Sequence, residues 1–196
     1  MKTNFTPLTH GYLFPNRFEK IIKIAGFKNK FIFGLCGGMV FSALDLYFNQ
    51  KSIPEFRSVQ EIDINYTKYL RKRQADSLSI IKILKIFFLA AIPIKRATTI
   101  TFDRFIPKIL DQLNDDLPTP LIIVRSNLLQ NPTNNHQVLA TGYQENETAI
   151  ILDIYDPNHP TQSVWLEVIK IQPFQINQST GEPVRALFLN DYKFKQ

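Results

Sequence analysis

The sequence is poor in the residues that build disulfides, metal centres and phosphate-binding loops. It has one cysteine, Cys36, and three histidines among 196 residues. A lone cysteine cannot form an intrachain disulfide, so nothing in the sequence indicates an oxidising compartment, and the thiol is expected to stay free. The same scarcity argues against the closed cluster of cysteines and histidines that holds structural zinc. Because the glycines near Cys36 also lack the spacing of a phosphate-binding loop, we expect no metal and no cofactor.

The sequence also lacks an apolar run long enough to cross a membrane. Its most apolar stretch, residues 78–94, is interrupted by Lys82 and Lys85, which leave only residues 86–94 uncharged. A bilayer crossing needs about 18 to 20 apolar residues. Residues 1–14 lack the continuous apolar core of a signal peptide. These two absences predict a cytoplasmic protein.

Residues 78–94 have the pattern of an amphipathic helix. At 100° per residue, one face collects the apolar side chains of Ile80, Ile83, Leu84, Phe87, Phe88 and Ala91. The other side collects Lys82, Lys85 and Leu89. This pattern favours a half-buried core helix. The alternative is a helix that contacts a membrane surface or docks a partner.

Positive charge is in excess but is not concentrated. The chain has 23 Lys and Arg against 17 Asp and Glu, a formal net charge of +6 and a pI of about 9.4. Only Lys68, Arg71, Lys72 and Arg73 form a tight basic group. A solvated helix face explains this group better than a contact with nucleic acid or lipid headgroups. We expect no specific nucleic-acid partner.

The apolar pattern changes its period near the middle of the chain. The first half favours helices at residues 36–48, 63–73, 78–91 and 102–113, with a short helix around 17–24 in an otherwise irregular N-terminal segment. The second half favours strands at residues 120–126, 136–143, 148–155, 163–171 and 186–189, two of them joined by a hairpin at 144–147. Because 196 residues are about the length of one ordinary domain, we expect a single α+β domain over residues 1–196 with an antiparallel sheet.

Cys36 lies at the start of an apolar helix, among Gly34, Gly37 and Gly38. Unpaired N–H groups at a helix N-terminus favour negative charge, so they lower the pKa of a thiol placed there and make it a better nucleophile. The glycines would let a substrate backbone approach, and the N–H of Cys36 could point at a developing oxyanion. The plainer interpretation is a buried cysteine that acts as a small apolar residue.

A nucleophilic thiol needs a base, and His136 is the best of the three histidines. It begins a strand, so its imidazole would lie at a sheet end. His10 lies in the irregular N-terminal segment and His159 follows a turn. Asp156 follows the next strand, where a carboxylate could orient the imidazole. Asp153 is the competitor, but the odd shift of three residues makes it face away from Asp156 in a regular strand.

Three motifs carry a resemblance to a known superfamily. They are FGLCGGM at 33–39, NHQVLA at 135–140 and YDPNHP at 155–160, and the segment at 11–18, GYLFPNRF, accompanies them. Together they resemble a widespread bacterial group of papain-like cysteine proteases and, more distantly, the peptidase domains that cleave bacteriocin leader peptides. The resemblance implies a Cys36, His136 and Asp156 triad in the papain order. It also implies a papain-like fold, with the nucleophile at a helix N-terminus in the helical half packed on the C-terminal antiparallel sheet.

The sequence departs from the papain-like pattern at one position. Such enzymes usually carry a glutamine six residues before the nucleophile as an oxyanion donor, and here that residue is Lys30. Asn16 or Asn29 could supply the amide instead.

The resemblance implies a papain-like cysteine hydrolase that acts on peptides or other amides through a thioester. Acyl transfer or deamidation would use the same triad. The other hypothesis is a catalytically inactive papain-like fold that serves as a binding module, for which the Lys30 substitution argues.

Overall fold

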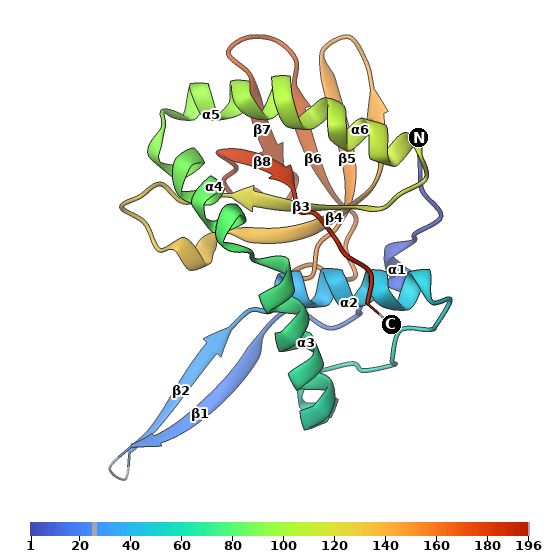
Figure 1. Ribbon diagram of the computed structural model, residues 1–196, viewed down its shortest axis with the longest axis vertical. Helices are drawn as coiled ribbons and strands as arrows, with labels where there is room; N and C mark the ends of the chain where they lie inside the picture. Colours follow the sequence, from blue (N-terminus) through green and yellow to red (C-terminus); the bar gives the residue numbers. More distant parts are fainter. Residues whose placement is uncertain (25–26, 196) are drawn as a thin grey trace.

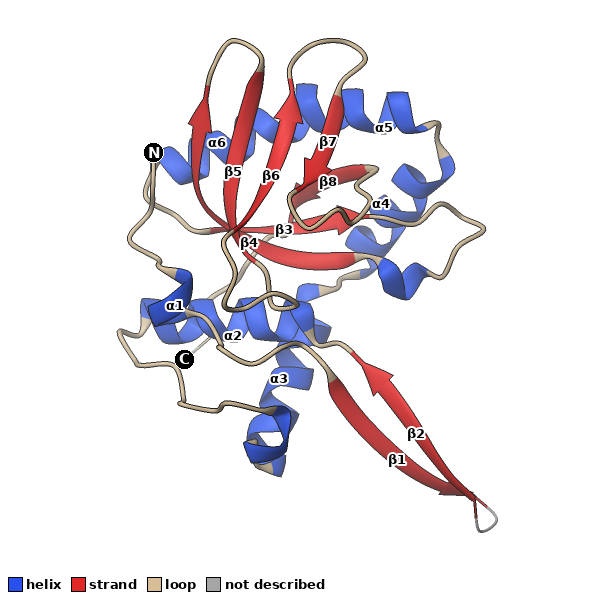
Figure 2. Cartoon of the chain, turned by 180° about the vertical axis from the view of Figure 1, so that it is seen from behind, coloured by secondary structure: helices blue, strands red, loops and turns tan. Residues whose placement is uncertain are grey.

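The structure, a computed structural model, describes residues 1–24 and 27–195, and for residues 20–24 and 27–32 it describes the backbone alone. Its helices and its curled antiparallel sheet form an α+β fold (Figures 1 and 2). The helices are α1 Pro7–His10, α2 Cys36–Phe48, α3 Ile64–Ser77, α4 Ile80–Ala91, α5 Ile94–Ile100 and α6 Ile106–Asn114, with a π-helical turn η2 at Thr101–Phe105 and the 3-10 turns η1 Val59–Glu61 and η3 Pro132–Asn134. The α+β expectation is confirmed.

The main sheet comes from the second half of the chain. Its strands are β3 Thr119–Val124, β4 His136–Glu145, β5 Ala149–Tyr155, β6 Val164–Ile169, β7 Gln175–Gln178 and β8 Ala186–Leu189, in the order β7-β6-β5-β4-β3-β8 and antiparallel throughout. The five expected strands and the hairpin between β4 and β5 are present. Strand β7 was not predicted because three of its four residues are polar.

Helices pack on the sheet in three places. In one of them, α4 and α5 pack on β3 and β8. The apolar side of α6 packs on the strands through Ile106, Ile109 and Leu113. Helices α2 and α3 lie at the other end of the molecule, where α2 packs with the N-terminal segment and with Leu139 of β4 (Figure 1). The helix expected at 102–113 is divided between the π-helical turn and α6.

The short helix expected around residues 17–24 is wrong. Those residues form β1, Phe18–Ile24, which pairs antiparallel with β2, Phe27–Phe33, in a hairpin that projects from the body (Figure 1). The sequences FEKIIKI and FKNKFIF are rich in aromatic and β-branched residues, which favour strands when a partner strand is near. The hairpin was missed because its partner strand was interpreted as irregular.

Helix α2 is buried along most of its length, as its sequence predicts. Gly38 explains how it approaches α3 so closely, because a Cβ atom there would lie 2.3 Å from the backbone oxygen of Leu70. Gly37 is buried as well. These two glycines therefore serve helix packing, and the expectation that they open the site to a substrate backbone is wrong for both.

Helix α4 has the opposite orientation from the one its pattern favours. Ile80, Leu84 and Phe88, expected on the core side, are 77%, 63% and 52% exposed, whereas Lys82 is buried. The ammonium of Lys82 donates to the backbone oxygen of Asp191 at 3.0 Å, and that of Lys85 lies 4.9 Å from the centre of the Phe188 ring. These contacts with the C-terminal segment hold the lysine side of α4 against the fold. Among the described residues, no helix is long and apolar enough to cross a membrane.

Candidate active site

Cys36 is the first residue of α2, as the sequence predicts. Its side chain is partly exposed and lines a cavity of about 850 Å³. The N–H of Leu35, the N-cap residue, donates a hydrogen bond to the side-chain oxygen of Asn16. The thiol therefore lies where the unpaired N–H groups of a helix start favour negative charge.

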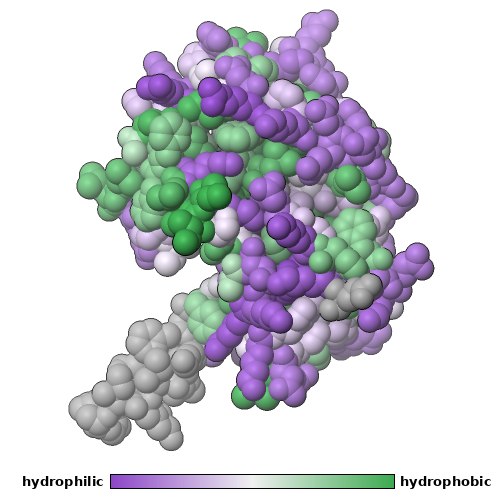
Figure 3. Space-filling model, viewed as in Figure 1, coloured by the Kyte–Doolittle hydropathy of each residue, from purple (hydrophilic) through white to green (hydrophobic). Residues whose placement is uncertain are grey.

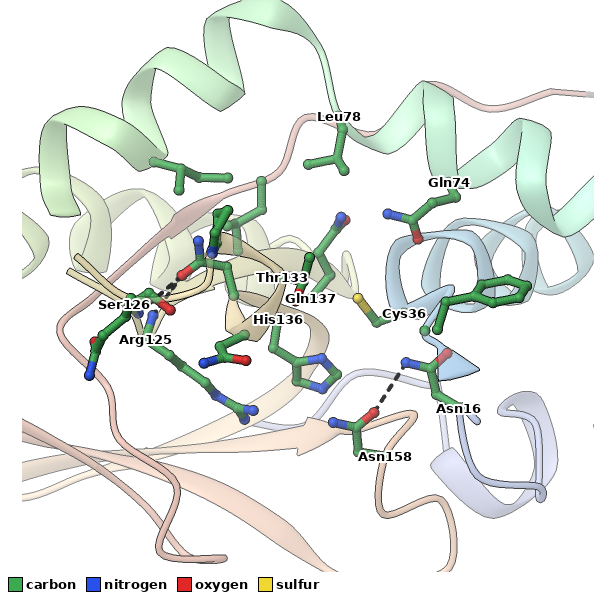
Figure 4. A pocket seen from close by; sticks show the side chains of 18 of the residues that line it. Asn16, Cys36, Gln74, Leu78, Arg125, Ser126, Thr133, His136, Gln137 and Asn158 are labelled. Carbon is green, nitrogen blue, oxygen red and sulfur yellow. Dashed lines mark hydrogen bonds between the residues drawn. The ribbon is translucent and has the colours of Figure 1, made fainter. Parts of the chain in front are cut away.

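His136 and Asp156 meet from neighbouring strands, and His136 lines the cavity. His136 opens β4, and Asp156 directly follows β5. The antiparallel pairing of Leu139 with Tyr155 brings the start of β4 beside the end of β5. The Nε2 atom of His136 lies 2.6 Å from Oδ1 of Asp156, and both side chains are buried. The other ring nitrogen is left on the side of Cys36, whose sulfur faces the imidazole (Figure 4).

The two competing histidines and the competing aspartate lie elsewhere. Asp153 points away and approaches the ammonium of Lys2 at 3.7 Å. The Nδ1 atom of His10 accepts the N–H of Thr6. The Nε2 atom of His159 lies 3.4 Å from a carboxylate oxygen of Glu182.

Cys36, His136 and Asp156 shift one another's pKa values. Burial by itself would raise the pKa of the Cys36 thiol, but the His136 imidazole and the backbone N–H groups of Gln137 and Gly37 lower this pKa below its ordinary value. Burial would lower the pKa of His136, but the charge and hydrogen bond of Asp156, together with the thiol, raise it to about 9. Burial opposes a low pKa for Asp156 too, and His136 lowers it. The arrangement favours a thiolate beside an imidazolium.

Two further hydrogen bonds fix the carboxylate of Asp156. The buried amide of Gln178 donates to Oδ2 of Asp156 at 2.9 Å, and the N–H of Asn158 donates to Oδ1 at 2.8 Å. Arg125 in turn donates to the amide oxygen of Gln178 at 2.9 Å. Gln178 was not found from the sequence, because it ends the unpredicted strand β7, 22 residues beyond Asp156.

Asn16 joins the two halves of the site. Its side-chain oxygen accepts the N–H of Leu35, and its Nδ2 donates to Asn158 at 3.1 Å (Figure 4). A Cβ on Gly34 would lie 2.7 Å from that Nδ2, so the absence of a side chain at Gly34 lets the amide lie beside Cys36. Asn16 and Cys36 therefore line the same cavity, with one N–H of the Asn16 amide donated to Asn158. The side chains of Asn29 and Lys30, the other positions considered, lie outside the described residues.

A second amide lies on the other side of the thiol. Gln74 of α3 accepts the N–H of Gly38 through Oε1 at 2.9 Å, which leaves its NH₂ group toward the cavity (Figure 4). The cavity lining is mostly neutral. Among the described residues of the lining, Arg125 is the one charged side chain besides His136, and it donates to Glu182 at 3.0 Å.

One group of described side chains has the residue types of a metal site. Single ligand atoms of Asp156, His159 and Glu182 lie within 4.8 Å of one another. Both carboxylates already accept hydrogen bonds, Asp156 from Gln178 and Glu182 from Gln178 and Arg125. The group therefore acts here as a hydrogen-bonded support behind the imidazole.

Comparison of the chain with protein-family models, with curated proteins and with solved structures gives no match. The functional argument therefore depends on the geometry of the site and on the motifs of this sequence.

Proposed function

We propose that the protein is a papain-like cysteine hydrolase that cleaves peptide or other amide bonds. One observation carries the proposal: Cys36, at the N-terminus of α2, faces an imidazole whose far nitrogen lies 2.6 Å from Asp156. A helix-start thiol beside a strand-borne histidine and aspartate, in that chain order, is also the arrangement that the sequence motifs imply. The buried helix against the antiparallel sheet agrees with a papain-like fold.

The chemistry follows from the position of each group. The Cys36 thiolate attacks the amide carbon, and the imidazolium of His136 gives its proton to the leaving amine. Asp156 holds the imidazole orientation and stabilises its charged form. The N–H of Cys36 and the NH₂ of Asn16 are placed to stabilise the oxyanion. Water then attacks the thioester with His136 as the base, which restores the thiol. An amine in place of water would give acyl transfer from the same site.

The Asn16 amide bears on the alternative of an inactive binding module. The argument for inactivity was the lysine at position 30 in place of an oxyanion-donating glutamine. Asn16 lines the same cavity as Cys36 and would supply a side-chain N–H donor from a different part of the chain. We therefore favour the enzyme over the binding module.

The first prediction concerns the reactivity of the only thiol. Iodoacetamide should alkylate Cys36 readily at pH 6, because its lowered pKa leaves thiolate present where an ordinary thiol, with a pKa near 8.5, is almost fully protonated. His136→Ala should slow alkylation at pH 6 by about tenfold or more, since each unit of pKa changes the thiolate fraction about tenfold. His10→Ala is the control and should leave the rate unchanged. Mass spectrometry of the intact chain measures each rate.

Turnover should be low at both acidic and strongly basic pH, with a maximum between them. Activity should rise as Cys36 ionises and fall above about pH 9, where His136 loses the proton that the leaving amine needs. A peptide library supplies the substrates. Asp156→Asn should reduce turnover less than Cys36→Ala if the aspartate only orients the imidazole. An alkylation midpoint near pH 8.5 that His136→Ala does not change would contradict the proposal and favour a binding module.

A further inference from the structure

The outward side of α4 is an exposed apolar surface. It consists of five side chains with exposed fractions of 47% to 77%, here called the α4 face: Ile80, Ile81, Leu84, Phe87 and Phe88. Figure 3 shows the corresponding green patch over α4, on the left of the molecule. Scattered apolar side chains are common on protein surfaces, but a contiguous patch of large ones marks a binding site for a protein or a membrane.

A hollow of about 490 Å³ lies beside the α4 face. It is lined by four cationic and four apolar side chains, here called the cationic hollow: Lys85, Arg96, Arg104 and Lys108, with Phe88, Leu89, Ile100 and Phe105. Phe88 belongs to both the α4 face and the hollow, so the two surfaces share a border. No acidic residue of the described chain lines the hollow, and the sequence has none between Asp76 and Asp103.

The charges of the hollow are not neutralised within the described part of the chain. No ion pair joins Lys85, Arg96, Arg104 or Lys108 to a described carboxylate. The ammonium of Lys85 lies over the rings of Phe105 and Phe188, 5.4 Å and 4.9 Å from their centres. Four like charges around one hollow repel one another, and an anion placed among them relieves that repulsion. The hollow therefore has the charge of a site for a phosphate group.

We propose that the α4 face and the cationic hollow together bind the surface of an anionic phospholipid bilayer. The α4 face would enter the boundary between headgroups and acyl chains, and the hollow would take lipid phosphates. A helix of 12 residues is too short to cross the bilayer, but it suits this interfacial position, with an apolar side inward and cations at the headgroups.

Other occupants fit the surface less well. A second copy packed on the α4 face by two-fold symmetry would repeat the same cations at the same interface, without acidic groups to oppose them. A nucleic acid would use the cations and the aromatic rings, but it would leave Ile80, Ile81 and Leu84 without a role. An anionic bilayer uses the aliphatic and the cationic groups together.

The test is flotation of the full chain with lipid vesicles. Vesicles of phosphatidylcholine alone and of phosphatidylcholine with about one third phosphatidylglycerol are compared at low and at high salt. The chain should float with the anionic vesicles, should bind the neutral ones at least tenfold less, and should lose affinity as salt screens the charges.

Two triple variants separate the two parts of the surface. Arg96→Gln, Arg104→Gln and Lys108→Gln together should weaken binding to anionic vesicles by about 100-fold, since each cation near the membrane contributes about fivefold. Its control is Lys51→Gln, Lys68→Gln and Lys72→Gln, which removes the same charge from exposed positions elsewhere and should reduce binding by less than about fivefold.

The apolar triple variant is Ile81→Gln, Leu84→Gln and Phe87→Gln, which should also weaken binding by about 100-fold or more. Its control replaces three exposed apolar residues elsewhere, Leu8, Leu129 and Ile171, by glutamine and should leave binding unchanged. Circular dichroism and the alkylation rate of Cys36 report whether each variant is folded.

Several results would overturn the proposal. One is absence of the chain from floated anionic vesicles at low salt, and another is equal loss of binding in the cationic variant and its control. Vesicle binding that the apolar variant retains would indicate electrostatic adsorption only. If the unmodified chain sediments as a dimer and the apolar variant as a monomer, the occupant of the α4 face would be a second copy of the chain. Tighter binding to single-stranded DNA, with no effect of the apolar variant, would favour a nucleic acid.

Discussion

Helices α2 and α4 are both composed mostly of apolar residues, yet α2 is mostly buried and α4 is mostly exposed. Nine residues of α2 are buried, from Gly37 to Asp45. In α4 only Lys82, Leu89 and Ala90 are buried, and six of its eight large apolar side chains are exposed. Apolar composition therefore does not by itself decide which helix enters the core.

Side-chain size and available partners explain the difference. Gly37, Gly38 and Ser42 give α2 a small-residue side on which α3 can pack closely. The one charged residue of α2, Asp45, is buried against Arg73, Tyr69 and Tyr192. In contrast, α4 is bulky on every side, and its buried Lys82 has only backbone oxygens as acceptors among the described residues. Three substitution pairs test this contrast.

The largest effect is expected at the buried charge of α2. Asp45 lies 2.7 Å from Nε of Arg73, which is 1% exposed, so Asp45→Ala leaves a buried guanidinium without its closest partner. The free energy of unfolding should fall by about 3 kcal/mol or more in urea titrations. Asp103→Ala, at an exposed position, is the control and should change it by less than about 0.5 kcal/mol. Similar small losses from both would show that α2 does not depend on this ion pair.

A smaller effect is expected when one side chain is enlarged in each helix. In Gly38→Ala, the new Cβ would meet the Leu70 oxygen at 2.3 Å and force α2 and α3 apart. We expect a net loss of about 2 kcal/mol, because overpacking exceeds the gain of about 1 kcal/mol in helix propensity. Alkylation of Cys36 at pH 6 should slow with it. Ala91→Leu enlarges an exposed position of α4 and should be nearly neutral. If Gly38→Ala stabilised the protein, the close packing described here would be wrong.

The smallest effect is expected at the buried lysine of α4. Lys82→Met should leave stability at pH 7 unchanged or raise it by up to about 1 kcal/mol, because the buried ammonium donates to backbone oxygens and the charge of the Asp191 carboxylate acts on it only from beyond hydrogen-bond distance. Burial lowers the pKa of Lys82. Since the unfolded chain then binds more protons than the folded one, this lysine makes stability rise with pH until about 10.4, its ordinary pKa.

The advantage of Lys82→Met should therefore shrink between pH 7 and pH 10. Urea titrations at the two pH values measure it, with Lys95→Met at an exposed position as the control. A loss above about 2 kcal/mol in Lys82→Met at pH 7 would show instead that the bonds from its ammonium to Ser77 and Asp191 stabilise α4.

Local pattern was enough to place most elements and the central contact of the site. The helix at Cys36 follows from its apolar run and glycine turn, and β4 and β5 follow from their β-branched runs. Chain order and the alternation of side chains along a strand then predicted that Asp156, and not Asp153, contacts His136. The structure has this contact. Asn16 could be offered as an amide donor, but the sequence could not rank it above Asn29.

Other features were decided by the tertiary structure, because they depend on contacts between distant residues. Periodicity gives the angle between side chains on a helix but not the side on which another element packs, so the C-terminal segment decided that Lys82 and Lys85 face inward. Pairing with a second strand decided that residues 18–24 form a hairpin. The support of Asp156 by Gln178 also required the sheet to form first, since a polar segment carries no periodic signal until its neighbours bury alternate residues.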